Sequence, residues 1–492
     1  MSFGNSPGVY NRIEDQSFVV SGGGVIAGGI VVSAKRGPTE VNVVTSAKQF
    51  IRQYGLPSRD NPSLYCALRF LNRAGILSVR RVINDATLAT GDLPDPNSGP
   101  VPHLTVEAAN EGAWGNAITV EFATIVGAPT GVFGVVVKED GQVVEQFSVS
   151  RDPDAKNGYG NNIFIEDVIN NQSEFIQVQD NPTITAPYNM SAVINLSGGA
   201  DDTVAPTSGD IMTAWDEFKN EEDVEAQLLI NAGWTAPSVQ SKMLEVADTR
   251  FDAYAILDVP QSAASSIQDM IDYRNTQLGA DTYFGGLYGG WLKVYDQYND
   301  REVTIPPSGD VAAAFVDTAT NYERWDAPAG MRRGVIPSTL GVTKVMNEGE
   351  RDMLYNNGIN PVTSFPGVNA VIFGQKSLQM AASALDRANV VMSLLWINER
   401  MKEALKPFVF EPNTEYTRNA VNFLLSSFLE SIQVRGGLYG FAVDTSTDIN
   451  TPQAIDNNEL MVDVYVQPVK TAEYVRVSTI VTRTGVSLSF GK

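Results

Sequence analysis

Two residue types that carry much of enzyme chemistry are almost missing from this 492-residue chain, which has one cysteine, Cys66, and one histidine, His103. A single cysteine cannot form a disulfide within the chain, and the apolar stretch around it (LYCALRFL) predicts a buried thiol. A Ser-His-Asp triad needs a histidine as its general base, and His103 lies in a proline-rich segment where we expect a surface position. We therefore expect no catalytic residues; an α/β hydrolase-type enzyme is an alternative that this scarcity disfavours.

Basic residues are also few, with 35 Lys and Arg against 57 Asp and Glu, a net charge of −22. Broad nucleic-acid binding needs clustered positive charge, so we expect no nucleic acid among the partners. No apolar run reaches the length of a membrane helix, and the N-terminus lacks the pattern of a signal peptide. The expectation is a chain made in a cytoplasm, without direct membrane insertion.

Cofactor and metal motifs are weak. Gly22, Gly24 and Ala27 fit G-x-G-x-x-A loosely, but the following residues continue a strand, whereas a dinucleotide fingerprint opens a helix. The turn that begins at Asp152 resembles a calcium loop, yet its twelfth position is Ile163 where glutamate is needed. We expect neither a cofactor nor a metal.

An α/β core is predicted by alternating strands and helices. Residues 25–33 and 77–82 read as strands, and Ser46 and Gly55 bound a helix between them. The alternation resumes near residue 210, which predicts a mainly parallel sheet with helices on both faces. Proline-rich residues 92–102 and glycine-rich residues 198–209 predict linkers around a β-rich insert, a small sandwich or barrel. The expected division is a discontinuous core at 23–92 and 207–365 with an inserted domain at 103–198.

The last quarter of the chain predicts an α+β domain at 366–484. A long helix is expected over 377–406, stopped by Pro407. A second helix follows a cap at Asn413 or Thr414 and ends at Gly436-Gly437. Two strands follow, and after the second the alternation changes parity at Gly485, which predicts a hinge and a separate arm strand at 485–492. The buried stripe expected on the second helix is Val421, Leu424, Leu425, Phe428 and Ile432.

Residues 1–22 read as an extended N-terminal arm, because a Pro7-Gly8 turn is followed by a segment with too few apolar residues to fold alone. A glycine run, Gly22, Gly23 and Gly24, would hinge it to the core.

Several segments resemble contractile phage tail sheath proteins. The stretches FVFEPNTEYTR, GGLYGFAV and NTPQAIDNNELMVDVYVQPVKTAEYV are similar to the C-terminal domain of that family, in the same order. The early VIAGG, RGP and VTSAKQFIRQYG, and the Pro-Pro-Ser-Gly and Ala-Pro-Ala-Gly runs, resemble it as well. The resemblance implies a subtilisin-like core fold and a structural subunit of a bacteriophage tail or of a related phage-tail-like injection particle. Such subunits form stacked hexameric rings around the tail tube and contract to drive the tube through the host envelope.

The resemblance also implies partners and sites. The partners are further copies of the chain, the tail tube protein, and baseplate and tail terminator proteins; the location is the virion, after assembly in the host cytoplasm. The C-terminal domain would face the tube, with Arg400, Lys402 and Lys406 as possible contacts. A soluble cargo-binding module is the remaining alternative.

Short terminal strands that are unstable alone predict strand exchange between subunits. The residues expected to take part in this exchange are Val9, Tyr10, Ile13, Phe18, Val462, Val464, Val466, Val475, Val477, Val481, Val486, Leu488 and Phe490.

Overall fold

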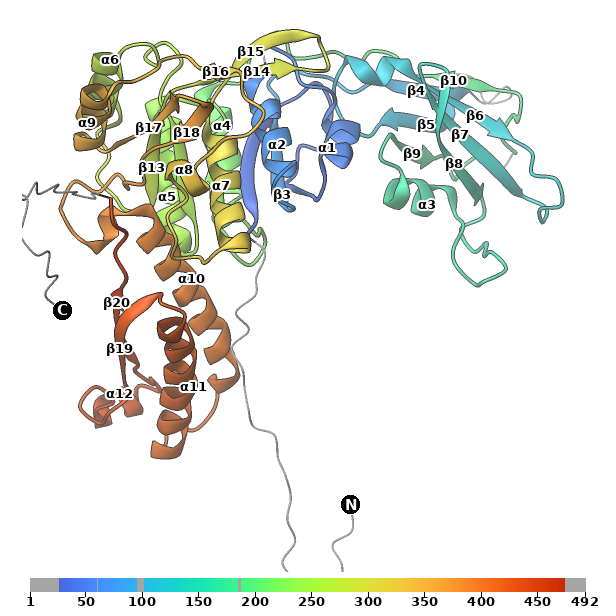
Figure 1. Cartoon of the computed structure of the whole chain (residues 1–492). Coiled ribbons are helices and arrows are strands. Elements are labelled where there is room, and N and C mark those ends of the chain that lie inside the picture. Colours follow the sequence, from blue (N-terminus) through green and yellow to red (C-terminus); the bar gives the residue numbers. More distant parts are fainter. Residues whose placement is uncertain (1–25, 60, 95–100, 185–186, 474–492) are drawn as a thin grey trace, which may run out of the picture.

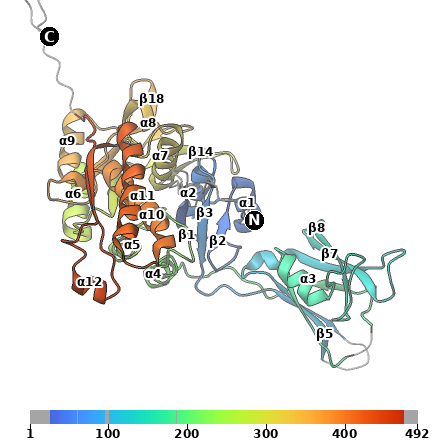
Figure 2. The same cartoon turned by 90° about the horizontal axis from the view of Figure 1, so that it is seen from below.

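The computed structural model describes residues 26–59, 61–94, 101–184 and 187–473, which form three parts (Figure 1). We call them the core, the insert (from residue 90 to about 197) and the C-terminal part (from residue 388 to 468), after which residues 469–473 return to the core. The insert and the C-terminal part leave the core in different directions (Figures 1 and 2).

The core is built on an eight-stranded sheet of order β18-β17-β13-β12-β11-β1-β3-β2. All pairings are parallel except those of the two edge strands, β18 and β2. The inner strands are buried along almost their whole length, as expected of a parallel sheet covered on both faces. The strands are β1 (Gly28–Ser33), β2 (Asn42–Val44), β3 (Leu77–Val82), β11 (Leu228–Ile230), β12 (Tyr254–Asp258), β13 (Gly285–Gly289), β17 (Ile359–Phe365) and β18 (Val368–Ile372).

Helices cover both faces of this sheet, which confirms the predicted α/β arrangement. Gly28 of β1 faces Phe70 of α2, whereas its neighbour Gly29 faces Phe218, next to α4, so these helices lie on opposite faces. Either glycine has heavy atoms at 2.9 Å from where a Cβ would be, so the missing side chains permit this close packing. The core helices are α1 (Ala47–Tyr54), α2 (Pro62–Leu71), α4 (Ser208–Asp216), α5 (Pro237–Arg250), α6 (Ile267–Asp272), the π-helical η2 (Tyr273–Leu278), α7 (Ser308–Asn321), α8 (Gly330–Arg333) and α9 (Glu348–Asn356).

A second, three-stranded antiparallel sheet flanks the core, in the order β15-β14-β16. The aromatic segment that precedes it divides between β13 and β14 at Gly290, whose φ is +110°. A Cβ there would lie 2.2 Å from the carbonyl oxygen of Val362, so the turn requires glycine. The strands are β14 (Leu292–Asp296), β15 (Arg301–Ile305) and β16 (Gly341–Val342).

The insert is β-rich, as predicted. Two antiparallel sheets, β10-β6-β7-β8 and β4-β5-β9, share one hydrophobic cluster. The predicted hairpin turn is present, because Asp140 and Gly141 join β7 to β8 with φ of +49° and +77°. The elements are β4 (Thr90–Pro94), β5 (Pro102–Ala108), η1 (Ala113–Ala117), β6 (Ile118–Ala123), β7 (Val132–Glu139), β8 (Gln142–Ser150), α3 (Ile165–Gln172), β9 (Ile176–Asp180) and β10 (Val193–Asn195).

The first linker prediction is wrong at both of its ends. Residues 92–94 belong to β4 and Pro102 begins β5, and these two strands pair with each other inside the insert. His103 is consequently not a surface residue: it is 2% exposed, and its ring lies edge-on to that of Tyr188 at 4.7 Å. The two described prolines, Pro94 and Pro102, therefore belong to paired strands of one sheet and not to a spacer between domains.

The connection between core and insert consists of two antiparallel segments, residues 83–90 and 197–204. Thr87 pairs with Ala200 and Thr90 with Ser197 through backbone hydrogen bonds. Asp202 Oδ1 accepts three backbone N–H groups, from residues 84, 85 and 86, at 2.8–2.9 Å. The start of the predicted second linker is therefore paired structure and not a free spacer.

A buried arginine holds the core and the insert together at this connection. Arg81 is 1% exposed and donates to the carbonyl oxygens of Ala34 and Gly37 in the core and of Glu111 in the insert, at 2.8–2.9 Å. Burial lowers its pKa, an effect that nearby carboxylates led by Glu111 oppose. All three branches of its guanidinium thus satisfy backbone acceptors on both sides of the connection.

The C-terminal part begins with α10, which starts eleven residues later than predicted, at Ala388. Residues 377–387 are instead held locally: Ser377 donates its hydroxyl to the carbonyl of Leu385, and Ser383 caps a short 3-10 helix. The second helix agrees with prediction, since Thr414 caps α11 and all five stripe residues are buried. The elements are η3 (Ala384–Asp386), α10 (Ala388–Leu405), η4 (Lys406–Phe408), α11 (Glu415–Val434), β19 (Leu438–Asp444), α12 (Pro452–Asp456) and β20 (Asp463–Pro468).

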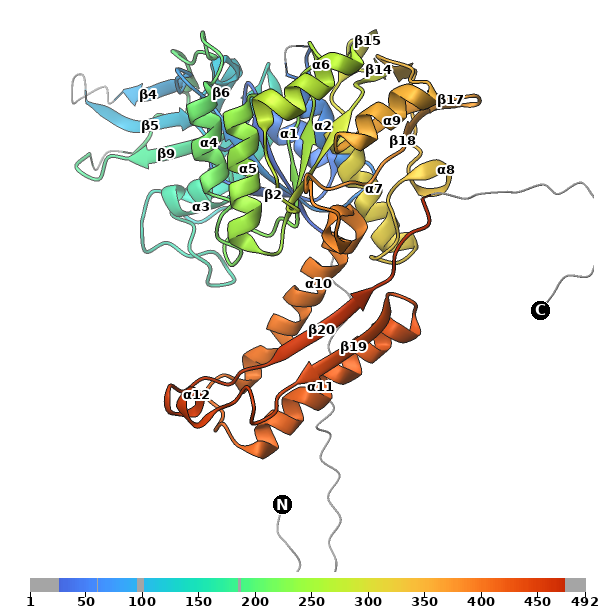
Figure 3. The same cartoon turned by 90° about the vertical axis from the view of Figure 1, so that its left-hand side faces the viewer.

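Helix α10 belongs to two hydrophobic clusters at once. Its first half, with Val391 and Leu395, lies in the cluster of the core, and Trp396 and Ile397 begin the cluster of the C-terminal part. Eighteen residues of α-helix span about 27 Å. The helix is therefore a continuous strut from the core into the C-terminal part (Figure 3). Among the described residues, no helix combines the length and hydropathy that crossing a bilayer requires.

Candidate assembly site

The feature with the clearest capacity to bind another chain is a two-stranded antiparallel sheet, β19-β20, at the surface of the C-terminal part (Figure 3). Phe441 lies opposite Val466, and Val443 opposite Val464. These four side chains pack on the cluster formed by α10 and α11. Two strands alone are marginal in water, so this sheet depends on the two helices beneath it.

Both outer edges of the sheet are unpaired in the part of the chain that the structure describes, where β19 and β20 have only each other as strand partners. An open edge presents a row of backbone donors and acceptors to a further strand. The outward face carries two exposed aromatic side chains, Tyr439 and Tyr465. A strand added at the β19 edge would have to displace two side-chain amides of α11, because Asn422 donates to the Val443 carbonyl at 2.8 Å and Gln433 donates to the Tyr439 carbonyl at 3.0 Å.

The predicted exchange residues fall into two groups. Val464 and Val466 lie in β20, half-buried on the helices, and Val462 immediately precedes it. Among the described residues the strand partner of β20 is β19, and a role of β20 as the acceptor of a neighbour's strand stays a prediction. The remaining predicted exchange and hinge residues lie outside the described residues: Val9, Tyr10, Ile13, Phe18, Gly22, Gly23, Gly24, Val475, Val477, Val481, Gly485, Val486, Leu488 and Phe490.

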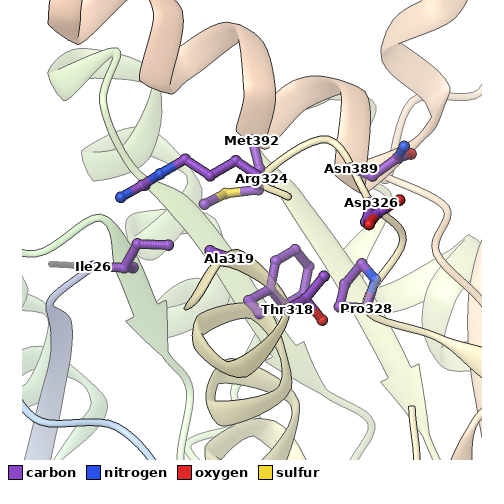
Figure 4. A pocket seen from close by; sticks show the side chains of 9 residues that line it. Ile26, Thr318, Ala319, Arg324, Asp326, Pro328, Asn389 and Met392 are labelled. Atoms are coloured by element: carbon purple, nitrogen blue, oxygen red, sulfur yellow. The ribbon is translucent and has the colours of Figure 1, made fainter. Parts of the chain in front are cut away.

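The N-terminal segment joins the fold at a crowded junction of core and C-terminal part. Ile26 is the first described residue, and it lines a cavity of about 10 Å³ with residues of α7 and α10 (Figure 4). Arg324 and Met392 face this cavity (Figure 4). The Arg324 guanidinium lies 5.3 Å from the centre of the Trp396 ring, and burial lowers the pKa of Arg324 to about 10. The cavity is too small for more than a water molecule, so it is a gap between packed side chains and not a ligand site.

The three candidate tube contacts have different environments. Arg400 pairs with Glu403 at 2.6 Å on its own helix. Lys402 pairs with Glu221 of the core, which raises the pKa of Lys402. Lys406 is exposed, and no described side chain forms an ion pair with it. It lies beside Val409 and Phe410, which are also exposed.

The carboxyl ends of the core strands hold a serine–aspartate pair, the nearest approach to a hydrolase site. The Ser308 hydroxyl donates to Asp258 Oδ2 at 2.6 Å, and the backbone N–H groups of Gly233 and Ser308 donate to the same carboxyl. Burial raises the pKa of Asp258 to about 7. Both side chains are fully buried, and His103 lies in the insert. The pair joins β12 to the start of α7 and presents no exposed nucleophile.

What sequence reasoning missed is the β19-β20 pairing itself. The signal for it was present, since Phe441 and Val443 alternate with Gly440 and Ala442 as a half-buried strand does.

Metal sites were not expected, and no group of His, Cys, Asp and Glu among the described residues is arranged to hold an ion.

Known proteins resemble this chain in sequence. The tail sheath protein of Enterobacteria phage T4 is 27% identical over 373 residues, which are 72% of this chain and 56% of that protein. The tail sheath protein of Vibrio phage KVP40 is 30% identical over 379 residues, 72% of this chain and 55% of that protein. The chain thus spans about half the length of the curated relatives it matches.

The fold matches solved structures at low sequence identity. The sheath tail protein from Listeria innocua has a TM-score of 0.62 at 13% identity, with 91% of this chain and 96% of that one covered. The helical sheath of the anti-feeding prophage in its contracted state gives 0.58 at 13%, covering 97% and 99%. A model of the phage tail sheath protein central domain matches residues 205–378, and one of the phage tail sheath C-terminal domain matches residues 381–482. Since the two models together match more than half of the sequence, this chain belongs to the phage tail sheath protein family.

Proposed function

We propose that this protein is the structural subunit of a contractile tail sheath, polymerising around a tail tube and shortening to drive that tube through a cell envelope. The single observation that carries the proposal is the open-edged β19-β20 sheet on a fold that matches sheath structures along nearly its whole length. A strand supplied by a neighbour to either edge would link subunits through backbone hydrogen bonds. Such a link tolerates rotation of whole domains, which contraction demands.

The finer expectations belong to the same proposal. The subunits form hexameric rings stacked in a helix, with the tube protein, the baseplate and the terminator as further partners, in a virion assembled in the host cytoplasm. The core keeps a subtilisin-like arrangement, for which its parallel sheet with helices on both faces is the support. Residues 1–22 and 485–492 act as the exchanged arms.

Electron microscopy of the purified chain tests the proposal. Negatively stained samples over a concentration series should show rings or ribbed tubes once the protein exceeds a threshold concentration. A chain that stays monomeric at every concentration would instead fit the cargo-binding alternative. Activity in a hydrolase screen, lost on Ser308→Ala substitution, would support the enzyme alternative.

Contact with the tube is proposed at the exposed tip of the C-terminal part. Of the three candidate cations, Lys406 is the most available to a partner, because Lys402 and Arg400 already bind carboxylates of their own chain. The exposed Val409 and Phe410 beside it add an apolar surface that no described residue covers. Together they suit a partner surface with both acidic and apolar groups.

Reversing this charge should destabilise the extended state. With Lys406→Glu, we expect assembled tails to contract prematurely, because an acidic tube would repel the new carboxylate. The fraction of contracted tails in micrographs is the measurement. Glu221→Gln is the control, since it removes the Lys402 ion pair without touching Lys406. If Lys406→Glu tails stay as extended as the control, this lysine interacts only with the end of its own helix.

A further inference from the structure

The last described residue of the chain is held by a polar cluster of the core. Glu473 Oε1 accepts from Arg387 Nε at 2.7 Å and from the Tyr355 hydroxyl at 2.8 Å, and Oε2 accepts from Arg387 Nη2 at 2.9 Å. The side-chain amide of Gln375 donates to Oε1 as well, at 3.2 Å. A two-pronged arginine–carboxylate pair with two further donors fixes both the position and the orientation of the carboxylate.

The groups in this cluster come from separate parts of the chain. Tyr355 lies on α9, Gln375 lies in the segment after β18, and Arg387 is the residue immediately before α10. Asn389, in the first turn of α10, also donates to the Thr471 hydroxyl at 3.1 Å. After β20 the chain therefore runs back along the start of α10 to the core (Figure 3).

The environment keeps the cluster in its paired form. Lys376 donates to the Tyr355 carbonyl and lies 4.5 Å from the centre of the Tyr355 ring. Burial, together with the charge of Glu473, raises the pKa of Tyr355, so its hydroxyl remains a donor. Asp386 is a second carboxylate on Arg387, at 2.9 Å, and within the described residues it forms no hydrogen bond or ion pair with residues 469–473.

The position of this cluster matters because the two connections of the C-terminal part meet there. The chain enters that part through Arg387 into α10 and leaves it through Pro468 at the end of β20. Glu473 returns the chain to the core before residue 474, where the C-terminal segment begins. The segment therefore starts from the core, whereas the β19-β20 sheet belongs to the C-terminal part.

We propose that Glu473 is a positioning residue for assembly: its pair with Arg387 fixes the start of segment 474–492 to the core, so that this segment reaches a neighbouring subunit from a defined point. The inference rests on the proposed function, in which the segment joins a neighbour's sheet. On this proposal, the segment links the core of one subunit mechanically to the C-terminal part of another. Releasing Glu473 would leave the Asn389–Thr471 hydrogen bond as the side-chain contact of the residues after β20 and would lower the effective concentration of the segment at the acceptor.

Charge reversal tests this role. With Glu473→Arg, repulsion between the new arginine and Arg387 should free the segment. The threshold concentration for tube formation should then rise about fivefold or more. The melting temperature of the monomer should fall by no more than about 3 °C, since the pair lies outside the hydrophobic clusters of the core and of the C-terminal part. The double variant with Arg387→Glu should recover much of the assembly. Glu473→Gln, which keeps the side-chain size, should give a smaller change in the same direction.

Asp386→Asn is the matched control, because it removes a carboxylate from the same arginine without releasing residue 473. It should assemble at the threshold of the intact chain. The inference is overturned if intact chain forms tubes and Glu473→Arg and Glu473→Gln form them at the same concentration, or if the double variant is no better than Glu473→Arg alone. Failure of the intact chain to form tubes would instead contradict the proposed function.

Discussion

Deleting residues 1–20 should leave a folded monomer that forms no tubes. The described residues from Ile26 onward already form continuous hydrophobic clusters in the core and in the C-terminal part. Residues 1–20 have few apolar side chains to add to them, so the melting temperature should stay within about 2 °C of that of the intact chain. Assembly should fail because one edge of each β19-β20 sheet would lack its added strand. Sedimentation and negative-stain microscopy of the deletion variant give the answer.

A competition experiment serves as the control for this deletion. A peptide with the sequence of residues 1–20, added in excess to the intact chain, should slow tube formation by occupying the acceptor edge. A peptide of the same composition in scrambled order should have no effect. Normal tubes from the deletion variant would show that the N-terminal segment is dispensable for linking subunits.

Replacing Arg81 with methionine should cause the largest loss of stability of any single substitution considered. The change leaves the carbonyl oxygens of Ala34, Gly37 and Glu111 without their buried donor. Each buried group left unsatisfied costs on the order of 1 kcal/mol or more, so we expect a loss of about 3 kcal/mol. Limited proteolysis should then cut within residues 83–90 and 197–204, which the intact connection protects.

Lys35→Met is the comparison for Arg81. Lys35 ties the core to the connecting segment 197–204, through Asp201 at 3.2 Å, but its side chain is 73% exposed. An exposed ion pair contributes at most about 1 kcal/mol. Equal effects of the two substitutions on urea denaturation and on cleavage would mean that Arg81 does not hold the insert in place.

Local chemistry made part of the fold predictable. The bounds of α1 follow from Ser46, whose hydroxyl accepts from the Gln49 N–H, and from Gly55, whose φ of +83° suits glycine. Thr414 marks the start of α11 in the same way. Such signals work because the donor and acceptor lie within one helical turn of each other.

Other features could not be read from the sequence because long-range packing decides them. Leu378 and Leu385 have helical spacing relative to the residues of α10. Leu378 is nevertheless buried from an irregular segment, and Leu385 packs on the core cluster from the short η3. Periodicity does not distinguish a helix from a segment that buries the same residues elsewhere. Glu473 and Arg387 are 86 residues apart, and their pairing follows only from the path of the chain after β20.

The most direct measurement is a cryo-EM map of the assembled polymer at a resolution that traces the backbone. We predict two added strands on each β19-β20 sheet, one per edge, whose connections lead to residues 1–22 and 485–492 of other subunits. A map in which both edges stay unpaired, or in which the added strands connect back to the same subunit, would contradict assembly by strand exchange.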